Sequence, residues 1–97
     1  MTFRFHLGAR IEYRASTEYY ESQLEGLGAR FTMAVEDAIR RILDDPNRWP
    51  LRIADTRRYL LQGFPYQIVY TVEGDTLVIH AVMHCARLPG DWHSRLE

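Results

Sequence analysis

The spacing of the apolar residues changes near Trp49 and Pro50, and this change divides the sequence into a helical part and a strand part. Beyond Pro50, apolar and polar residues alternate with a period of two, which is typical of β-strands with one buried face. Glu73, Gly74 and Asp75 interrupt the alternation with a hairpin-turn signal. The sequence therefore predicts a meander of three strands, over residues 56–62, 66–72 and 76–84.

Before this boundary the apolar residues recur every three or four positions, which predicts two amphipathic helices over residues 9–24 and 29–43. Gly26 and Gly28 mark the break between the helices, and Pro46 ends the second one. The link is short, so the pair should form an antiparallel helical hairpin. Phe3 and Phe5 alternate with polar residues and predict a first strand over residues 3–6.

These elements predict an α+β domain in the order β-α-α-β-β-β, in which an antiparallel sheet carries the helical hairpin on one face. The length of residues 1–97 suits a single domain of this kind. We expect the last strand to turn four apolar side chains towards the helices, namely Leu77, Ile79, Ala81 and Met83. The expected helix–sheet core contains Phe31, Val35, Ile39, Ile68, Ile79 and Ala81.

The opposite face of the sheet has no predicted helix to cover it. Its side chains mix apolar and polar groups: Val69, Val78 and Val82 with Gln67, Thr71, His80 and His84. An exposed apolar surface on a small protein marks an interaction site. We therefore expect this face to be open, or to be covered by a partner segment that folds on binding.

Charge and cysteine content restrict the classes of function. The formal net charge is −1, and all 12 basic residues are arginine. This balance argues against a protein that holds nucleic acid by charge alone, although it leaves room for a local basic patch. Cys85 is the only cysteine, so no internal disulfide is expected. No apolar run is long enough to span a bilayer, and residues 1–6 lack a signal core, so we expect a cytoplasmic protein.

Six short segments, taken in order, resemble the RelE/ParE toxin family of bacterial type II toxin–antitoxin systems, and the match runs over nearly the whole chain. They are residues 18–20 (EYY), 26–31 (GLGARF), 46–50 (PNRWP), 57–61 (RRYLL), 64–70 (FPYQIVY) and 84–92 (HCARLPGDW). The resemblance implies a growth-inhibiting toxin. It also implies a partner, a cognate antitoxin encoded beside it, which holds the toxin inactive until the antitoxin is degraded.

Members that resemble RelE cleave mRNA on the ribosome, whereas members that resemble ParE inhibit DNA gyrase and lack the nuclease site. By resemblance, Arg58 and Arg87 fall where the nucleases have basic residues, and His84 lies near the end of the sheet where some relatives use a histidine. Gln67, however, occupies the position of the mid-sheet arginine, and Trp92 falls at or near the position of the C-terminal tyrosine. Glutamine brings no charge to a transition state and tryptophan no acidic proton, so the ParE-like branch is favoured.

Three functions remain open from the sequence. The first is a gyrase inhibitor without catalytic residues, the second a ribosome-dependent mRNA endonuclease with Arg58, His84 and Arg87 in its site, and the third a non-toxic interaction module. The residues expected to contact a partner are Arg57, Arg58, Gln67, Arg87 and Trp92. Arg57 and Arg58 should point to opposite faces of a regular strand, so at most one of them joins a given surface.

Some candidates also have a purely structural interpretation. His84 can fix the C-terminal segment by hydrogen bonds, and Arg87 can pin that segment to the domain. His80 and His84 share a strand, but even with the adjacent Cys85 the local sequence does not complete a set of four metal ligands, so we expect no metal site. The chain has no Walker loop and no GxGxxG motif, so we expect no cofactor.

Overall fold

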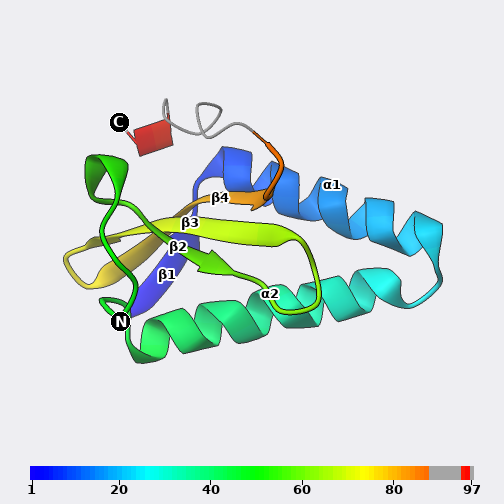
Figure 1. Ribbon diagram of the computed structural model, residues 1–97, viewed down its shortest axis with the longest axis horizontal. Coiled ribbons are helices and arrows are strands. Elements are labelled where there is room, and N and C mark those ends of the chain that lie inside the picture. The colour runs from blue at the N-terminus through cyan, green and yellow to red at the C-terminus, as the bar shows by residue number, and fades with distance from the viewer. Residues whose placement is uncertain (88–94, 97) are drawn as a thin grey trace.

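The structure, a computed structural model, describes residues 1–87 and 95–96 (Figure 1). Its elements are, in chain order, β1 (Thr2–Phe5), α1 (Leu7–Gln23), α2 (Leu27–Asp44), the 3-10 turn η1 (Ile53–Asp55), β2 (Arg57–Leu60), β3 (Tyr66–Glu73) and β4 (Thr76–His84). The predicted α+β class and the order β-α-α-β-β-β are confirmed. Within the described residues, no helix combines the length and the apolarity that crossing a membrane requires.

A histidine, rather than one of the usual short polar residues, caps the first helix. α1 begins at Leu7, before the predicted residue 9, because His6 keeps an extended backbone and its Nδ1 accepts a hydrogen bond from the Gly8 amide at 3.0 Å. This bond satisfies one of the amides that a helix start leaves without an internal partner. The cap fixes the direction in which the chain leaves β1.

The two helices lie antiparallel, and their junction is held by Glu21. Gly26 has a φ of 88°, a left-handed conformation that glycine adopts without steric cost. The Glu21 carboxylate accepts hydrogen bonds from the amides of Gly26 and Gly28, at 3.1 and 3.0 Å. A Cβ on Gly28 would lie 2.9 Å from the carbonyl oxygen of Thr17. The sequence Gly-Leu-Gly is therefore needed both for the turn and for the close approach of α1 to α2.

The sheet is mixed, which corrects the prediction of a wholly antiparallel sheet. Its strand order is β1-β4-β3-β2, and the pairs β2–β3 and β3–β4 are antiparallel as predicted. β1 pairs with β4 in parallel, with Thr2 opposite Thr76 and Phe5 opposite Ile79. The helical hairpin carries the chain across the sheet before β2 begins (Figure 1). This crossover lets β1 cover the side of β4 that the meander leaves unpaired, which alternation within a strand does not reveal.

A β-bulge in β4 reverses the predicted faces of its second half. Val69 pairs with Ala81 but Tyr70 pairs with Ile79, so His80 is an extra residue on β4. Beyond it, Val82 joins the core beneath the helices, whereas Ala81 packs with Val69 and Met83 on the other face. The prediction that Ala81 and Met83 face the helices is therefore wrong. The remaining expected core residues are confirmed: Phe31, Val35, Ile39, Ile68 and Ile79.

The second face of the sheet is buried, which corrects the prediction of an open apolar surface. Val69 and Ala81 are fully buried, Val78 is 2% exposed, and Gln67, Thr71 and His80 are buried as well. Leu96 packs against the cluster of Val69, Ala81 and Met83. Leu96 thus supplies part of a cover that periodicity within the strands does not predict.

Candidate functional site

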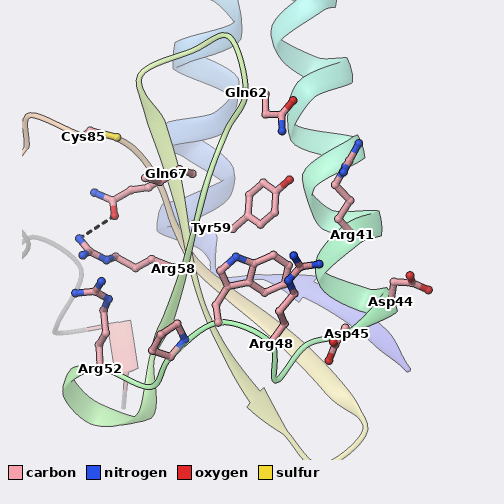
Figure 2. A pocket seen from close by; sticks show the side chains of 13 residues that line it. Arg41, Asp44, Asp45, Arg48, Arg52, Arg58, Tyr59, Gln62, Gln67 and Cys85 are labelled. Atoms are coloured by element: carbon pink, nitrogen blue, oxygen red, sulfur yellow. Dashed lines mark hydrogen bonds between the residues drawn. The ribbon is translucent and has the colours of Figure 1, made fainter.

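A cleft of about 660 Å³ lies between the C-terminal end of α2 and the edge strand β2 (Figure 2). Its walls carry four arginines, and its other polar side chains include two aspartates and two glutamines. The charged and amide-bearing residues are Arg41, Asp44, Asp45, Arg48, Arg52, Arg58, Gln62 and Gln67. In the view of Figure 2, Arg52 and Arg58 extend to the same side of β2 as Gln67, whereas Asp44 and Asp45 lie beside α2.

The loop between α2 and β2 is fixed by Arg57 and by aromatic contacts. The Arg57 guanidinium donates to the carbonyl oxygens of Asn47, at 3.3 Å, and Trp49, and to Asn47 Oδ1 at 3.2 Å. The Trp49 ring packs edge-on against Tyr59 with centroids 5.0 Å apart, and the Tyr70 hydroxyl donates to the Pro46 carbonyl at 2.9 Å. The loop wall of the cleft is thereby tied to β2 and β3.

The turn that leads into β2 contains a strained segment. Ala54 and Asp55 have φ angles of 55° and 60°, in the left-handed region that residues with a side chain seldom adopt. The Thr56 hydroxyl donates to the Ile53 carbonyl at 2.7 Å, and the Arg52 amide donates to the Thr56 carbonyl at 2.7 Å. These bonds close the turn and set Arg52 at the rim of the cleft. Such strain persists where the surroundings enforce it, often at functional sites.

Three arginines of the cleft keep a charge that no carboxylate of the described residues neutralises. Arg58 donates to Gln67 Oε1 at 3.2 Å, a neutral acceptor, and Arg48 lies over the Trp49 ring at 5.6 Å. Arg41, in contrast, pairs with Asp37 at 2.8 Å. Within residues 1–87 and 95–96, Arg48, Arg52 and Arg58 have no ion pair with a carboxylate. The cleft is therefore suited to a ligand that carries negative oxygen groups.

Among the described residues, nothing pairs with the backbone of β2 on the side away from β3. Leu61 donates to the Tyr66 carbonyl at 2.9 Å, and this pair sets the alternation of the β2–β3 ladder. Arg57 and Tyr59 therefore bond to β3, whereas Arg58 and Leu60 direct their N–H and C=O groups outward. In the part of the chain that the structure describes, no other backbone group meets them.

Comparison with known proteins identifies the family. Residues 3–89 match the family described as the ParE toxin of the type II toxin–antitoxin system parDE. The chain belongs to the ParE toxin family. A chain of the chromosomal ParDE toxin–antitoxin system from P. aeruginosa has a similar fold, with a TM-score of 0.62 and 16% identity over 87% of this chain and 95% of that one. No curated protein sequence matches this one.

Among the described residues, the cleft of this ParE-family chain unites two of those expected from the sequence. Arg58 and Gln67 meet there. Arg57 points to the other face of the strand, as predicted, and holds the loop. Arg48 and Arg52 also line the cleft. The sequence did not predict them as site residues, because residues in an irregular loop have no periodicity from which their position can be inferred.

Three further candidates lie elsewhere or cannot be placed. Arg87 Nη1 lies 3.4 Å from Glu12 Oε2 on α1. His84 accepts a hydrogen bond on Nδ1 from the Ala86 amide at 3.0 Å and packs edge-on against Tyr66, which matches its structural interpretation. Trp92 lies outside the described residues, so its expected contact with a partner stays a prediction.

Glu12 of α1 joins the helix to β4 and to the C-terminal residues. One oxygen of the Glu12 carboxylate accepts a hydrogen bond from the Val82 amide at 3.2 Å. The same carboxylate also accepts hydrogen bonds from the guanidinium groups of Arg87 and Arg95. Arg95 in turn donates to the His80 carbonyl at 2.9 Å. Glu12 and Arg95 thus satisfy backbone groups of β4 beyond the point where β1 ends. Gly8 leaves room for this arrangement, since a Cβ there would lie 2.6 Å from Arg95 Nε.

His80, the bulge residue, is buried in a mostly neutral setting. Its Nε2 lies 2.8 Å from the Thr71 hydroxyl, and its Nδ1 has no hydrogen-bond partner among the described residues. Burial lowers the pKa of the His80 imidazole, and the Glu73 carboxylate at 3.9 Å only partly offsets this effect. Elsewhere too, the described residues contain no group of three His, Cys, Asp or Glu side chains that could hold a metal ion.

Proposed function

We propose that this ParE-family chain is a cytoplasmic toxin that an antitoxin encoded beside it neutralises, and that it stops growth by binding an essential target such as DNA gyrase. It does so without cleaving RNA. The observation that carries the proposal is the pairing of Arg58 with Gln67. Gln67 is 5% exposed. By resemblance to the family, it occupies the position at which a nuclease related to RelE has a second cation. A neutral amide at that position supports a binding role.

The positions of the other candidates also support a toxin without a catalytic centre. Arg58 lines the cleft, Arg87 contacts Glu12, and the His84 ring is used by the Ala86 amide and Tyr66. General acid–base cleavage requires its proton donors, proton acceptors and cations around one reacting phosphate. These three side chains are engaged in separate contacts instead.

Supercoiling assays with the purified chain and DNA gyrase test the target. We expect dose-dependent loss of supercoiling, accumulation of cleaved DNA–gyrase complexes, and recovery when the purified product of the neighbouring reading frame is added. Recovery by that protein, and not by an unrelated acidic protein, is the control for specific neutralisation. Unaltered supercoiling with no trapped complex would remove gyrase as the target.

Three cleft arginines without an ion pair to a described carboxylate, Arg48, Arg52 and Arg58, favour one second candidate, the ribosome-dependent mRNA endonuclease. Primer extension on translated messages after induction separates it from the gyrase inhibitor, because only a nuclease creates new 5′ ends. Arg58→Gln should abolish such ends, whereas Arg40→Gln, an exposed arginine of α2 paired with Asp37, should not. A chain whose induction leaves growth unaffected would instead be the non-toxic interaction module.

A further inference from the structure

We propose that the free edge of β2 takes an extended, acidic segment of the antitoxin as an additional strand of the sheet. The proposal rests on the proposed function, because it requires that a neighbouring antitoxin binds this chain. It adds the place where one segment of that partner docks, its conformation and its charge.

The edge itself is available for pairing. β2 is the last strand in the order β1-β4-β3-β2, so β3 is its only neighbour in the sheet formed by the described residues. The N–H and C=O groups of Arg58 and Leu60 point outward, as the alternation of the β2–β3 ladder requires. Unpaired groups on an edge strand are a template on which a peptide can add by main-chain hydrogen bonds.

The charge beside this edge selects an acidic occupant. Arg58 is held by the neutral Gln67, Arg48 lies over Trp49, and Arg52 stands at the rim of the same cleft. Figure 2 shows the Arg52 and Arg58 guanidinium groups extending to the same side of β2. A strand added to β2 would place alternate side chains on that side, where Asp or Glu can pair with a guanidinium through two hydrogen bonds.

Leu60 indicates that the docking segment also carries an apolar residue. Its side chain is 65% exposed and lies on the same face of β2 as that of Arg58. An added strand would therefore place one side chain opposite Arg58 and another, two positions along, opposite Leu60. The segment that fits best has an acidic and an apolar residue at these two positions.

The other edge of the sheet lacks this preference. The groove beside Phe3 of β1 is lined by Glu36 and Arg40, with Ile39 and Leu43. Its charges are of both signs, so it offers no excess of positive charge to an acidic strand. β1 itself carries one exposed arginine, Arg4, whereas Arg48, Arg52 and Arg58 lie beside β2. Charge complementarity therefore favours β2 over β1 for the acidic segment.

Amide hydrogen exchange, measured by NMR on the full chain alone and in complex with the product of the neighbouring reading frame, tests this docking. We expect the amides of Arg58 and Leu60 to exchange rapidly in the free chain and roughly tenfold or more slowly in the complex. Arg57 and Tyr59, already bonded to β3, serve as internal references. A complex that leaves Arg58 and Leu60 unprotected overturns the proposal, whereas the antitoxin partnership stands.

Two variants test the same edge through affinity. Leu60→Pro removes an outward N–H and leaves the β2–β3 bonds intact, and the double variant Arg52→Gln with Arg58→Gln removes charge. Each should weaken the complex by about tenfold, and the double variant should also reduce its salt dependence. Arg40→Gln is the matched control and should change nothing. Unchanged affinity for both variants, with melting temperatures like the parent's, overturns the proposal.

Other occupants of the edge would give different results. Protection of Arg58 and Leu60 in the chain alone, increasing with its concentration, would assign the edge to a second copy. Protection by a single-stranded oligothymidylate, with none by the neighbouring protein, would assign the cleft to nucleic acid. Either result overturns the proposal. Absence of any complex, with toxicity unrelieved, overturns the antitoxin partnership as well and is thereby distinct from a complex without edge protection.

Discussion

Glu12 and Arg95, 83 positions apart in the sequence, form a two-pronged ion pair with N–O distances of 2.8 and 3.1 Å. Both side chains are mostly buried, at 11% and 17% exposure, and Glu12 also accepts the Val82 amide. The pair fastens the C-terminal residues to α1 and to β4. Loss of this ion pair should therefore lower the stability of the whole domain.

Glu12→Gln should lower the free energy of unfolding by about 3 kcal/mol, because it leaves the Arg95 charge without its partner in a mostly buried place. Chemical denaturation monitored by circular dichroism measures this. Asp37→Asn is the matched control: it breaks the exposed Asp37–Arg41 pair, which should cost no more than about 0.5 kcal/mol. Equal losses for the two variants would contradict the assignment of Glu12 as the main link.

Adjacent arginines of β2 should behave differently. Arg57→Gln removes the donors to the Asn47 and Trp49 carbonyls and should cost about 1–3 kcal/mol of stability. Arg58→Gln should cost about 1 kcal/mol or less, because among the described residues Arg58 makes a single hydrogen bond, to the neutral side-chain amide of Gln67. Thermal unfolding of both variants decides the point, and a reversed order would show that the two side chains have been assigned to the wrong faces.

Arg87→Ala should reduce growth inhibition and leave the fold intact. The Arg87–Glu12 contact is long, at 3.4 Å, and Arg87 is 48% exposed, so the loss of this contact should cost about 1 kcal/mol at most. The measurement compares growth after induction with the melting temperature of the purified variant. Full toxicity together with a clearly lower melting temperature would show instead that Arg87 only pins the C-terminal segment.

The stability of the fold should fall in mild acid because of His80. Burial lowers its pKa below the ordinary value of 6.5, so the folded chain binds fewer protons than the unfolded chain. The contribution of neutral His80 is complete above that value and is lost as the pH falls below it. Melting temperatures between about pH 7.5 and about pH 5 should therefore drop less steeply for His80→Gln than for the parent chain. Parallel curves would argue that other groups govern the acid response.

Ile68→Ala should destabilise the fold by about 2–5 kcal/mol, since Ile68 is fully buried under the helices and its truncation leaves a cavity. Denaturant unfolding gives the value. Leu60→Ala, on the opposite face of the sheet and 65% exposed, should change stability by about 0.5 kcal/mol or less and is the control. A loss below about 1 kcal/mol for Ile68→Ala would mean that the site collapses without a cavity.

Local sequence patterns predicted the elements well because their signals are local. Alternation located β3 and β4 almost to the residue, and the spacing of Phe31, Val35 and Ile39 located the buried face of α2. The bulge at His80 escaped prediction because one inserted residue leaves the apolar character of β4 unchanged on both faces. Every residue from Leu77 to Met83 is buried, so composition gives no indication of where the faces exchange.

Contacts between distant segments were the part that sequence patterns missed. Neither the parallel pairing of β1 with β4 nor the link from Glu12 to Arg95 has a local signature. The cleft likewise depends on a loop whose left-handed turn at Ala54 and Asp55 occurs without glycine. Resemblance to a family predicted Arg58 and Gln67 as site residues. That Arg48 and Arg52 line the same cleft was visible only in the structure.

The pairing of β1 with β4 also bears on when the chain becomes active. Translation produces β1 first, yet its partner strand spans Thr76–His84, so β1 must wait until most of the chain has been synthesised. Closing so long a loop is slow compared with the formation of the helical hairpin. An incomplete chain on the ribosome therefore lacks a finished sheet. Under the function that we propose, this delay gives an antitoxin already present in the cell time to meet each new molecule as it folds.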